Sequence, residues 1–319
     1  MKFQKLNLLV LLTLILGFTF GECGDSVSQT VTEEAANNAK KETLQMEQPS
    51  DLGMSQDSLD AKVKQKGVDA YETKKSELQK EAVQALELTT TALKALRKKD
   101  KKAALEALEK ATGKLEVLLL QDPELGLMPF DVDIQRHDLV ADLASIKAIK
   151  KAVQKAIKNN YYQLAKRKLD NLASEIQVNT YSLPLKTYPD AMKVAAAFVK
   201  EDKLDEAKLV LEKALNTTVL TEKYIPLPII RAEVLIEEAT KLDAKKEDKK
   251  KEVLQLLDNA EYQLILAEEL GYGKRDKEYK ELNLAIDKIK KSVESNGDSQ
   301  GFFKDLKEKL AKFKKRIVA

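Results

Sequence analysis

Residues 178–238 constrain the fold more than any other part of the sequence. Two proline-bearing segments, Val178–Pro189 and Val219–Pro228, have the Val, Thr and Tyr content of extended chain, and they bracket a stretch with helical periodicity. Four of the chain's seven prolines lie in these segments: Pro184, Pro189, Pro226 and Pro228. Proline is tolerated at helix starts, turns and sheet edges, so the helices must end and restart around it. We therefore expect a helical hairpin held between two extended segments.

Most of the chain beyond residue 57 has apolar residues at the three- and four-residue steps of amphipathic helices. Glycine is scarce, at 11 residues, and aromatic residues make up only 5%, as in helical proteins. The pattern predicts a long helix from Leu59 to Arg97, a helix capped by Asp138 and ending near Lys158, and a helix stopped by Gly271. The predicted fold class is all-α, with packed helical hairpins and short extended, β-like connecting segments.

Four predicted helices share one apolar pattern, in which a small or apolar residue is followed by Leu four positions on and another such residue three further on. The four sets are Ala104/Leu108/Ala111, Ala165/Leu169/Leu172, Ala207/Leu211/Ala214 and Val253/Leu257/Ala260. Their spacing is irregular, and the aromatic and glycine positions of tetratricopeptide repeats are missing. This favours degenerate packed hairpins over a regular solenoid.

A third extended segment lies earlier in the chain than the two proline-bearing segments. Apolar residues alternate with aspartates from Phe130 to Ile134, which is the period of a strand. We expect the three extended segments to pair into a small sheet that braces the helices.

The first 57 residues read as an export leader and a linker. Lys2 and Lys5 precede an apolar run too short to span a membrane comfortably, so residues 1–22 are predicted to be a signal peptide. Cys23 follows directly, and two interpretations stay open: acylation of Cys23, which would anchor the protein to a membrane, or cleavage after Gly21 that leaves an unpaired cysteine. The polar residues 23–57 are predicted to be a disordered tether. The expected location is the periplasm or cell envelope, either soluble or as a lipoprotein.

Composition excludes several functional classes. The 55 Lys and Arg against 52 Asp and Glu give a net charge of +3 with the signs interspersed, which argues against a nucleic-acid binder. One His and one Cys exclude cysteine-rich zinc sites and intrachain disulfides. No phosphate loop or nucleotide fingerprint occurs. Asp131 and Asp133 share one face of an extended segment, but they are too few for a calcium site and read as a solvated face. We therefore predict no catalytic residue, no metal and no cofactor.

The candidate binding residues are the aromatic and proline side chains of the two extended segments, with a neighbouring arginine. These eight are Tyr181, Pro184, Tyr188, Pro189, Tyr224, Pro226, Pro228 and Arg231. One interpretation is an aromatic groove for a small molecule or peptide. The other is that they pack the two segments against the hairpin, with Arg231 bonded to loop carbonyls.

Two further features have competing interpretations. Histidine is the side chain type that titrates near neutral pH, so His137 is a candidate pH sensor, or else an ordinary surface histidine at a helix start. Residues 296–319 form a basic amphipathic helix that could lie on an anionic membrane or pack against the preceding helix, Asp276–Ser295.

Several sequence strings together resemble the YfdX family. They are Asn179–Leu185 (NTYSLPL), Tyr188–Pro189, Asp205–Lys208 (DEAK), Ile225–Pro228 with Arg231–Ala232, and Leu266–Gly273 (LAEELGYG). The resemblance is strongest over residues 76–295, within a predicted domain of residues 58–295, and does not reach the leader. It implies an exported, mostly helical bacterial protein linked to stress, especially acid and multidrug response, with chaperone-like or small-molecule-binding behaviour. The family has no established catalytic residues, so the resemblance transfers no site.

The leading functional hypothesis is a non-enzymatic, stress-associated helical protein of the cell envelope with a chaperone-like interaction role. The alternative is a small-molecule or peptide binder that uses segments 178–189 and 219–228. The expected partners are client proteins or small molecules, with homo-oligomers as a further expectation and no nucleic acid. An enzyme is the least favoured class.

Overall fold

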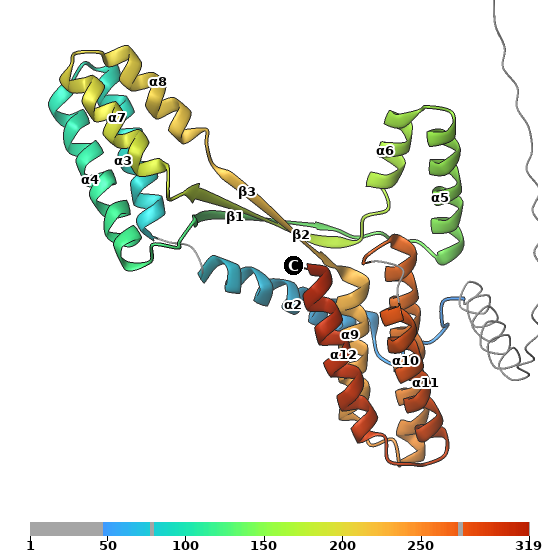
Figure 1. Ribbon diagram of the computed structural model, residues 1–319. Coiled ribbons are helices and arrows are strands. Elements are labelled where there is room, and N and C mark those ends of the chain that lie inside the picture. Colours follow the sequence, from blue (N-terminus) through green and yellow to red (C-terminus); the bar gives the residue numbers. More distant parts are fainter. Residues whose placement is uncertain (1–46, 77–79, 274–276, 319) are drawn as a thin grey trace, which may run out of the picture. The chain divides into compact units, whose positions relative to one another are not determined.

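The computed structural model describes residues 47–318 except 77–79 and 274–276, and the side chains of residues 74–76 are also not described (Figure 1). The described residues form eleven helices and three strands. The first half contains α2 (Gln56–Ser76), α3 (Lys80–Arg97), α4 (Lys101–Gln121), β1 (Leu127–His137), α5 (Leu143–Lys158), α6 (Tyr162–Asp170) and β2 (Glu175–Pro184). The second half contains α7 (Tyr188–Lys200), α8 (Leu204–Leu215), β3 (Val219–Pro226), α9 (Leu227–Lys241), α10 (Glu247–Leu270), α11 (Lys277–Glu294) and α12 (Gln300–Val318).

The three strands form one antiparallel sheet in the order β1-β2-β3, so the predicted pairing of the three extended segments is confirmed. The chain is mostly helical, as predicted, but the all-α class leaves out this sheet. Its strands have 11, 10 and 8 residues and are more than short connections. The two turns of the sheet are replaced by helical hairpins, α5–α6 between β1 and β2 and α7–α8 between β2 and β3 (Figure 1).

Strand β2 contributes side chains to two separate hydrophobic cores. Near its start, Ile176 and Val178 join the core formed with α2 and α9–α12. At its end, Leu183 joins the core of α3, α4, α7 and α8, together with Leu185 just beyond the strand. Each fully buried Leu or Ile contributes roughly 1.5–3 kcal/mol of apolar transfer free energy. The sheet therefore connects two helical cores.

Helix ends agree with the sequence in some places and differ in others. Gly271 adopts φ +92 and ends α10, as predicted, because glycine pays no Cβ penalty in the left-handed region. The prediction that Asp138 caps the next helix is wrong. Asp142 caps α5 instead, since its carboxylate accepts a 2.7 Å hydrogen bond from the Ser145 amide.

The first described residues are held to the fold. Asp51, inside the predicted tether, accepts hydrogen bonds from Gln255 at 2.6 Å and from Asn259 at 2.7 Å, both on α10. Leu52 and Met54 pack against the same core as α10. The predicted signal peptide, Cys23 and the tether up to residue 46 lie outside the described residues. Within the part of the chain that the structure describes, no helix is both long and apolar enough to cross a bilayer.

Candidate functional site

An open groove of about 410 Å³ lies between α2 and the β1 side of the sheet. The helix contributes Val63, Lys64, Gly67, Val68 and Tyr71, and the sheet contributes Val132, Asp133, Ile134, Arg136 and Ile176. Its size falls within the range of ligand pockets, and its lining is largely apolar with a few charged groups.

The alternation of β1 places apolar side chains in this groove. Val132, Ile134 and Arg136 are two residues apart, so they share one face of the sheet and point toward α2. Ile176 of β2 lies opposite Arg136 and is only 4% exposed. On the helix side, Val68 is 43% exposed, so the groove presents an apolar side chain to its opening.

Gly67 allows α2 to approach the sheet closely. A Cβ atom at this position would lie 2.9 Å from Cδ1 of Ile176, nearer than side-chain carbons normally approach. The sequence indicates only that Gly67 weakens the helix. The structure shows that it also makes room for the sheet.

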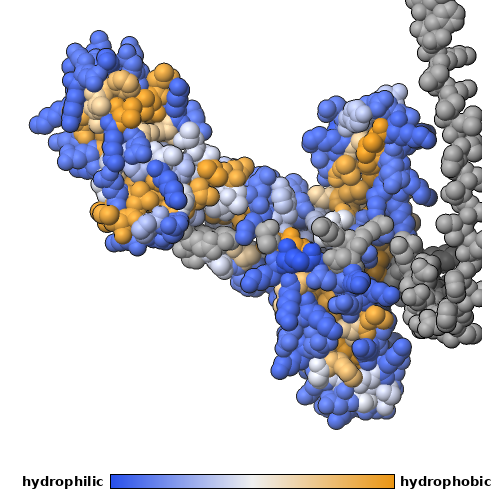
Figure 2. All heavy atoms as spheres, viewed as in Figure 1, coloured by the Kyte–Doolittle hydropathy of each residue, from blue (hydrophilic) through white to orange (hydrophobic). Residues whose placement is uncertain are grey.

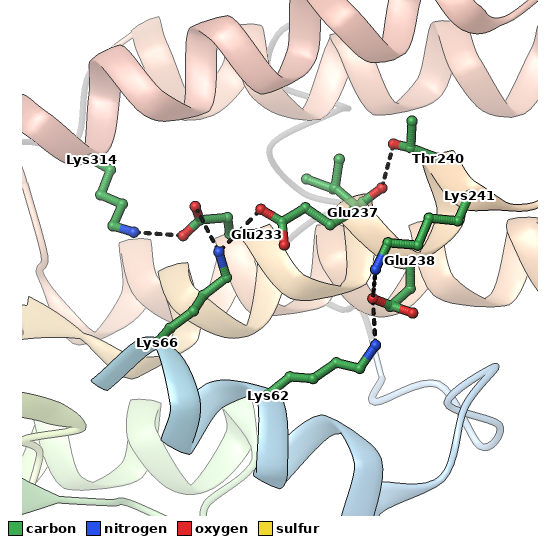
Figure 3. Close-up of polar contacts among 9 residues, drawn as sticks. Lys62, Lys66, Glu233, Glu237, Glu238, Thr240, Lys241 and Lys314 are labelled. Atoms are coloured by element: carbon green, nitrogen blue, oxygen red, sulfur yellow. Dashed lines mark hydrogen bonds and ion pairs between the residues drawn. The ribbon is translucent and has the colours of Figure 1, made fainter. Parts of the chain in front are cut away.

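Ion pairs from α2 to α9 hold the helix that forms one wall (Figure 3). Lys62 lies 2.6 Å from Glu238, and Lys66 lies 3.2 Å from Glu233 and 3.1 Å from Glu237. Burial alone lowers the pKa of Lys66, but the two carboxylates outweigh it, so the pKa rises above its ordinary value. Lys66 therefore stays charged, and its two acceptors hold α2 in place.

Helix α12 joins this network. Lys314 lies 2.6 Å from Glu233, so this carboxylate sits between cations from α12 and α2 (Figure 3). Glu238 likewise pairs with Lys241 at 2.6 Å as well as with Lys62. Burial alone raises the pKa of Glu238, but the two lysines outweigh it, and the pKa falls.

Asp138 fixes the other end of the groove. Its carboxylate accepts two hydrogen bonds of 2.8 Å from Arg231 of α9 and one of 2.7 Å from Arg136, which lines the groove. Burial alone raises the pKa of Asp138, but the two guanidinium groups outweigh it and hold the pKa below its ordinary value. The expected bonding of Arg231 to loop carbonyls is thus replaced by an ion pair to a residue 93 positions away.

The other face of the sheet is polar. Asp133 accepts from Gln135 at 2.9 Å and from Asn179 at 3.4 Å. Gln177 donates to Asn179 at 2.9 Å and to Glu222 at 3.1 Å, so one network crosses all three strands. Asn179 is 6% exposed and is satisfied by these contacts. Among the described residues, no cluster of His, Cys, Asp or Glu could hold a metal ion.

The eight predicted binding residues divide between the two ends of β2. Pro184, Tyr188 and Pro189 lie at its end, where Tyr188 is 1% exposed and donates a 3.1 Å hydrogen bond to Thr89. Burial raises the pKa of the Tyr188 hydroxyl.

The remaining members lie toward or at the start of β2. Pro226 pairs with Glu175 in the register, and Tyr224 pairs with Gln177, while Pro228 and Arg231 follow on α9. The nine steps from Glu175 to Pro184 span roughly 30 Å at the usual rise of a strand. The structure therefore does not bring the eight residues into one groove. Tyr181 lies between the two ends, paired with Leu220.

His137 is exposed at the end of β1, opposite Glu175 in the register. Its role as a pH sensor stays a prediction. Asp131 is also exposed, and its carboxylate accepts a 2.9 Å hydrogen bond from the amide of Val132.

The C-terminal helix packs against its predecessor. Its buried residues are Phe303, Leu306, Leu310 and Phe313, and Phe313 meets Tyr279 of α11 at a ring separation of 4.7 Å. Phe302 is 45% exposed, because its neighbour Phe303 is the residue that falls on the buried face with Leu306. The apolar face is thus occupied by protein.

Sequence reasoning missed the α2–β1 groove. The available signals were the alternation of Val132 and Ile134 and the presence of Gly67 within a helical pattern. Neither signal shows that α2 faces β1, because the groove joins residues at least 61 positions apart in the sequence (132 − 71 = 61).

The fold defines a class of mostly helical protein in which helical hairpins replace the turns of a three-stranded sheet. Residues 85–224 match the model of the YfdX family, described as YfdX protein, so the predicted resemblance to that family is confirmed over this part of the chain. The matched region runs from α3 into β3 and covers less than half of the 319 residues. It includes the β1 wall of the groove but not α2, and it is shorter than the predicted 76–295.

The comparison with solved structures also finds similar chains. The crystal structure of Salmonella Typhi YfdX is 15% identical, with a TM-score of 0.32, over 47% of this chain and 93% of that chain. No curated protein matches the chain. The likeness to the YfdX family therefore depends on the sequence match over residues 85–224.

Proposed function

We propose that this is a non-enzymatic, chaperone-like protein of the cell envelope that binds exposed, extended segments of client proteins in the α2–β1 groove. The observation that carries the proposal is an apolar groove that follows an edge strand of the sheet. The envelope location and the link to stress are expectations from the predicted leader and the family resemblance. Acylation of Cys23 and homo-oligomer formation stay predictions.

An edge strand suits an extended polypeptide. Strand β1 is paired only on its β2 side within the sheet, and the inter-element backbone bonds of the described residues include none to its outer edge. An extended segment can pair with such an edge through its backbone, whatever its sequence. Alternate apolar side chains of that segment would then meet Val68, Val132 and Ile134. This mode gives the low sequence selectivity that a chaperone-like role needs.

The charged groups of the groove support a binding role over catalysis. Arg136 is bonded to Asp138, and the carboxylate of Asp133 lies on the polar face of the sheet, where it accepts from two amide side chains. The third group is Lys64. The residues that line the groove include no nucleophile paired with a base, which is the arrangement that covalent catalysis requires.

A substitution at Val68 tests the proposal. Val68→Glu places a charge in the apolar opening, and we expect it to reduce the suppression of heat-induced citrate synthase aggregation, measured by light scattering. Val117→Glu is the matched control, since Val117 is 53% exposed on α4, away from the groove. Circular dichroism melting of both variants verifies folding. Equal suppression by Val68→Glu and the unchanged protein would contradict the proposal.

A second candidate is binding of a small apolar anion in the same groove. The volume of about 410 Å³ and the cations Lys64 and Arg136 at an apolar lining favour it. The test is fluorescence titration with 1-anilinonaphthalene-8-sulfonate. Saturable binding that Val68→Glu abolishes and Val117→Glu preserves supports this function; equal binding by both variants rejects it.

A further inference from the structure

The α5–α6 hairpin carries a concentrated positive charge that the net charge of the chain conceals. Residues 143–170 contain eight basic residues and one acidic residue, Asp170, so their net charge is 8 − 1 = +7. The whole chain has +3, so the remaining residues sum to 3 − 7 = −4. The basic residues are Lys147, Lys150, Lys151, Lys155, Lys158, Lys166, Arg167 and Lys168.

Three lysines form an exposed stripe on α5. Lys151, Lys155 and Lys158 are spaced by four and three residues, so they share one helix face, away from the buried Val153. All three are exposed, and none is in an ion pair within the described part of the chain. Lys150, on another side of α5, is already paired with Glu269 at 2.7 Å. The stripe is therefore free to meet an external anion.

Large apolar side chains are exposed beside this charge. Ile157, Tyr161, Tyr162, Leu164 and Leu169 are 47%, 62%, 60%, 40% and 49% exposed, all within 13 residues around the turn of the hairpin. In Figure 2 the hairpin carries a strip of hydrophobic residues bordered by hydrophilic ones. Contiguous apolar exposure of this kind marks an interaction surface.

The hairpin is attached to the rest of the fold through the first part of α5. Leu143 and Ile146 pack with Tyr262, Ile265 and Leu266 of α10. Toward the turn, a separate small core contains only Val153, Ala156 and Ala165, with Ile149 beside it. The turn and the lysine stripe thus lie beyond the part that packs on α10.

We propose that the α5–α6 hairpin docks on an anionic lipid surface, with the lysine stripe at the headgroups and Tyr161 and Tyr162 in the interfacial layer. Basic side chains around exposed aromatic and aliphatic groups are the chemistry of interfacial helices, where tyrosine prefers the headgroup level. A nucleic acid would pair its phosphates with the lysines but would leave the exposed side chains of Ile157 and Leu169 without an apolar partner. The assignment also replaces α12 as the membrane-contacting element, because the apolar face of α12 is buried in protein.

A lone tryptophan reports contact at the turn directly, because the chain has no Trp. The full chain with Tyr161→Trp is mixed with vesicles of phosphatidylglycerol and phosphatidylcholine, and with vesicles of phosphatidylcholine alone. We expect a blue shift of the emission only with the anionic vesicles. Phe302→Trp, at a 45% exposed site on α12, is the control and should not shift. The readout is local, so contact made by the leader or by Cys23 does not imitate it.

Charge removal provides the second arm. In the Tyr161→Trp background, replacing Lys151, Lys155 and Lys158 by Gln should weaken vesicle partitioning roughly 100-fold, since a lysine near an anionic surface contributes about fivefold. The same change at Lys304, Lys307 and Lys312, exposed on α12, is the matched control and should leave the partitioning unchanged. An unshifted Tyr161→Trp emission, equal effects of the two triple variants, or a response to duplex DNA and not to vesicles would each overturn the proposal.

Discussion

Replacement of Asp138 by Asn should destabilise the protein by about 2 kcal/mol at pH 7. The carboxylate accepts two hydrogen bonds of 2.8 Å from Arg231, whose side chain is 12% exposed, and one from Arg136. Hydrogen bonds to charged groups contribute about 1.5–3 kcal/mol, and the lower half of that range fits a carboxylate that is 27% exposed. Asn keeps one acceptor oxygen but leaves Arg231 without its counter-charge.

The pH dependence of this effect has a definite sign. The pKa of Asp138 is lowered from 3.8 in the folded protein because the arginines outweigh the effect of burial. Folding therefore favours the ionised form, and this stabilisation is complete above pH 3.8 and lost as the pH falls through the folded-state pKa. Asp138→Asn should consequently be less stable at pH 7 and equal to the unchanged protein in strong acid.

Urea denaturation followed by circular dichroism from pH 7 to pH 2.5 measures both quantities. Glu109→Gln, which removes an exposed carboxylate of α4 that has no ion pair among the described residues, is the control and should change the free energy of unfolding little. Equal stability of Asp138→Asn and the unchanged protein at pH 7 would refute the stabilising role of the Asp138 carboxylate. A deficit in the free energy of unfolding that persists unchanged to pH 2.5 would refute it as well.

Four further substitutions test the core packing and one helix end. Leu211→Ala should lower the free energy of unfolding by about 2–5 kcal/mol in urea denaturation, because Leu211 is 0% exposed. Leu169→Ala, at the equivalent position of the repeat pattern, should lower it by under about 1 kcal/mol, because Leu169 is 49% exposed. Equal losses would mean that both leucines are buried, as the repeat pattern predicts, and would contradict the structure. Tyr188→Phe should lower the free energy of unfolding by about 1 kcal/mol, and with it the melting temperature, because the Tyr188 hydroxyl donates a hydrogen bond to Thr89 inside the core. An unchanged melting temperature would contradict that hydrogen bond. Gly271→Ala should lower the free energy of unfolding by about 1–2 kcal/mol in the same assay, because a residue with a Cβ is strained at a φ of +92. An added Cβ would meet no atom within 4 Å, so no steric clash contributes to this loss. An unchanged free energy of unfolding would contradict the left-handed end of α10.

The sequence predicts elements well where the signal is local. The end of α10 at Gly271, the helix start after Pro226 and the three extended segments all follow from residues within one turn or strand. The pairing of the strands was also predictable, because isolated Val- and Thr-rich segments need partners for their backbone groups.

Long-range contacts decided the features that sequence reasoning missed. Asp138 and Asp142 are equally suited to cap a helix, and Arg231, far along the chain, engages the first of them. In the same way, the groove requires α2 to lie against β1, and only Gly67 indicates a close approach. The basic hairpin was concealed because acidic residues elsewhere offset its charge in the total.

The placement of client proteins in the α2–β1 groove is tested most directly by site-specific crosslinking. Cys23 is the only cysteine of the chain, so a Cys23→Ser background allows a photoreactive thiol reagent to be attached at Val68→Cys or at Val117→Cys. Illumination during heat denaturation of citrate synthase should give covalent client adducts from position 68 in clear excess over position 117. Equal yields at the two positions, or a greater yield at position 117, would contradict the account.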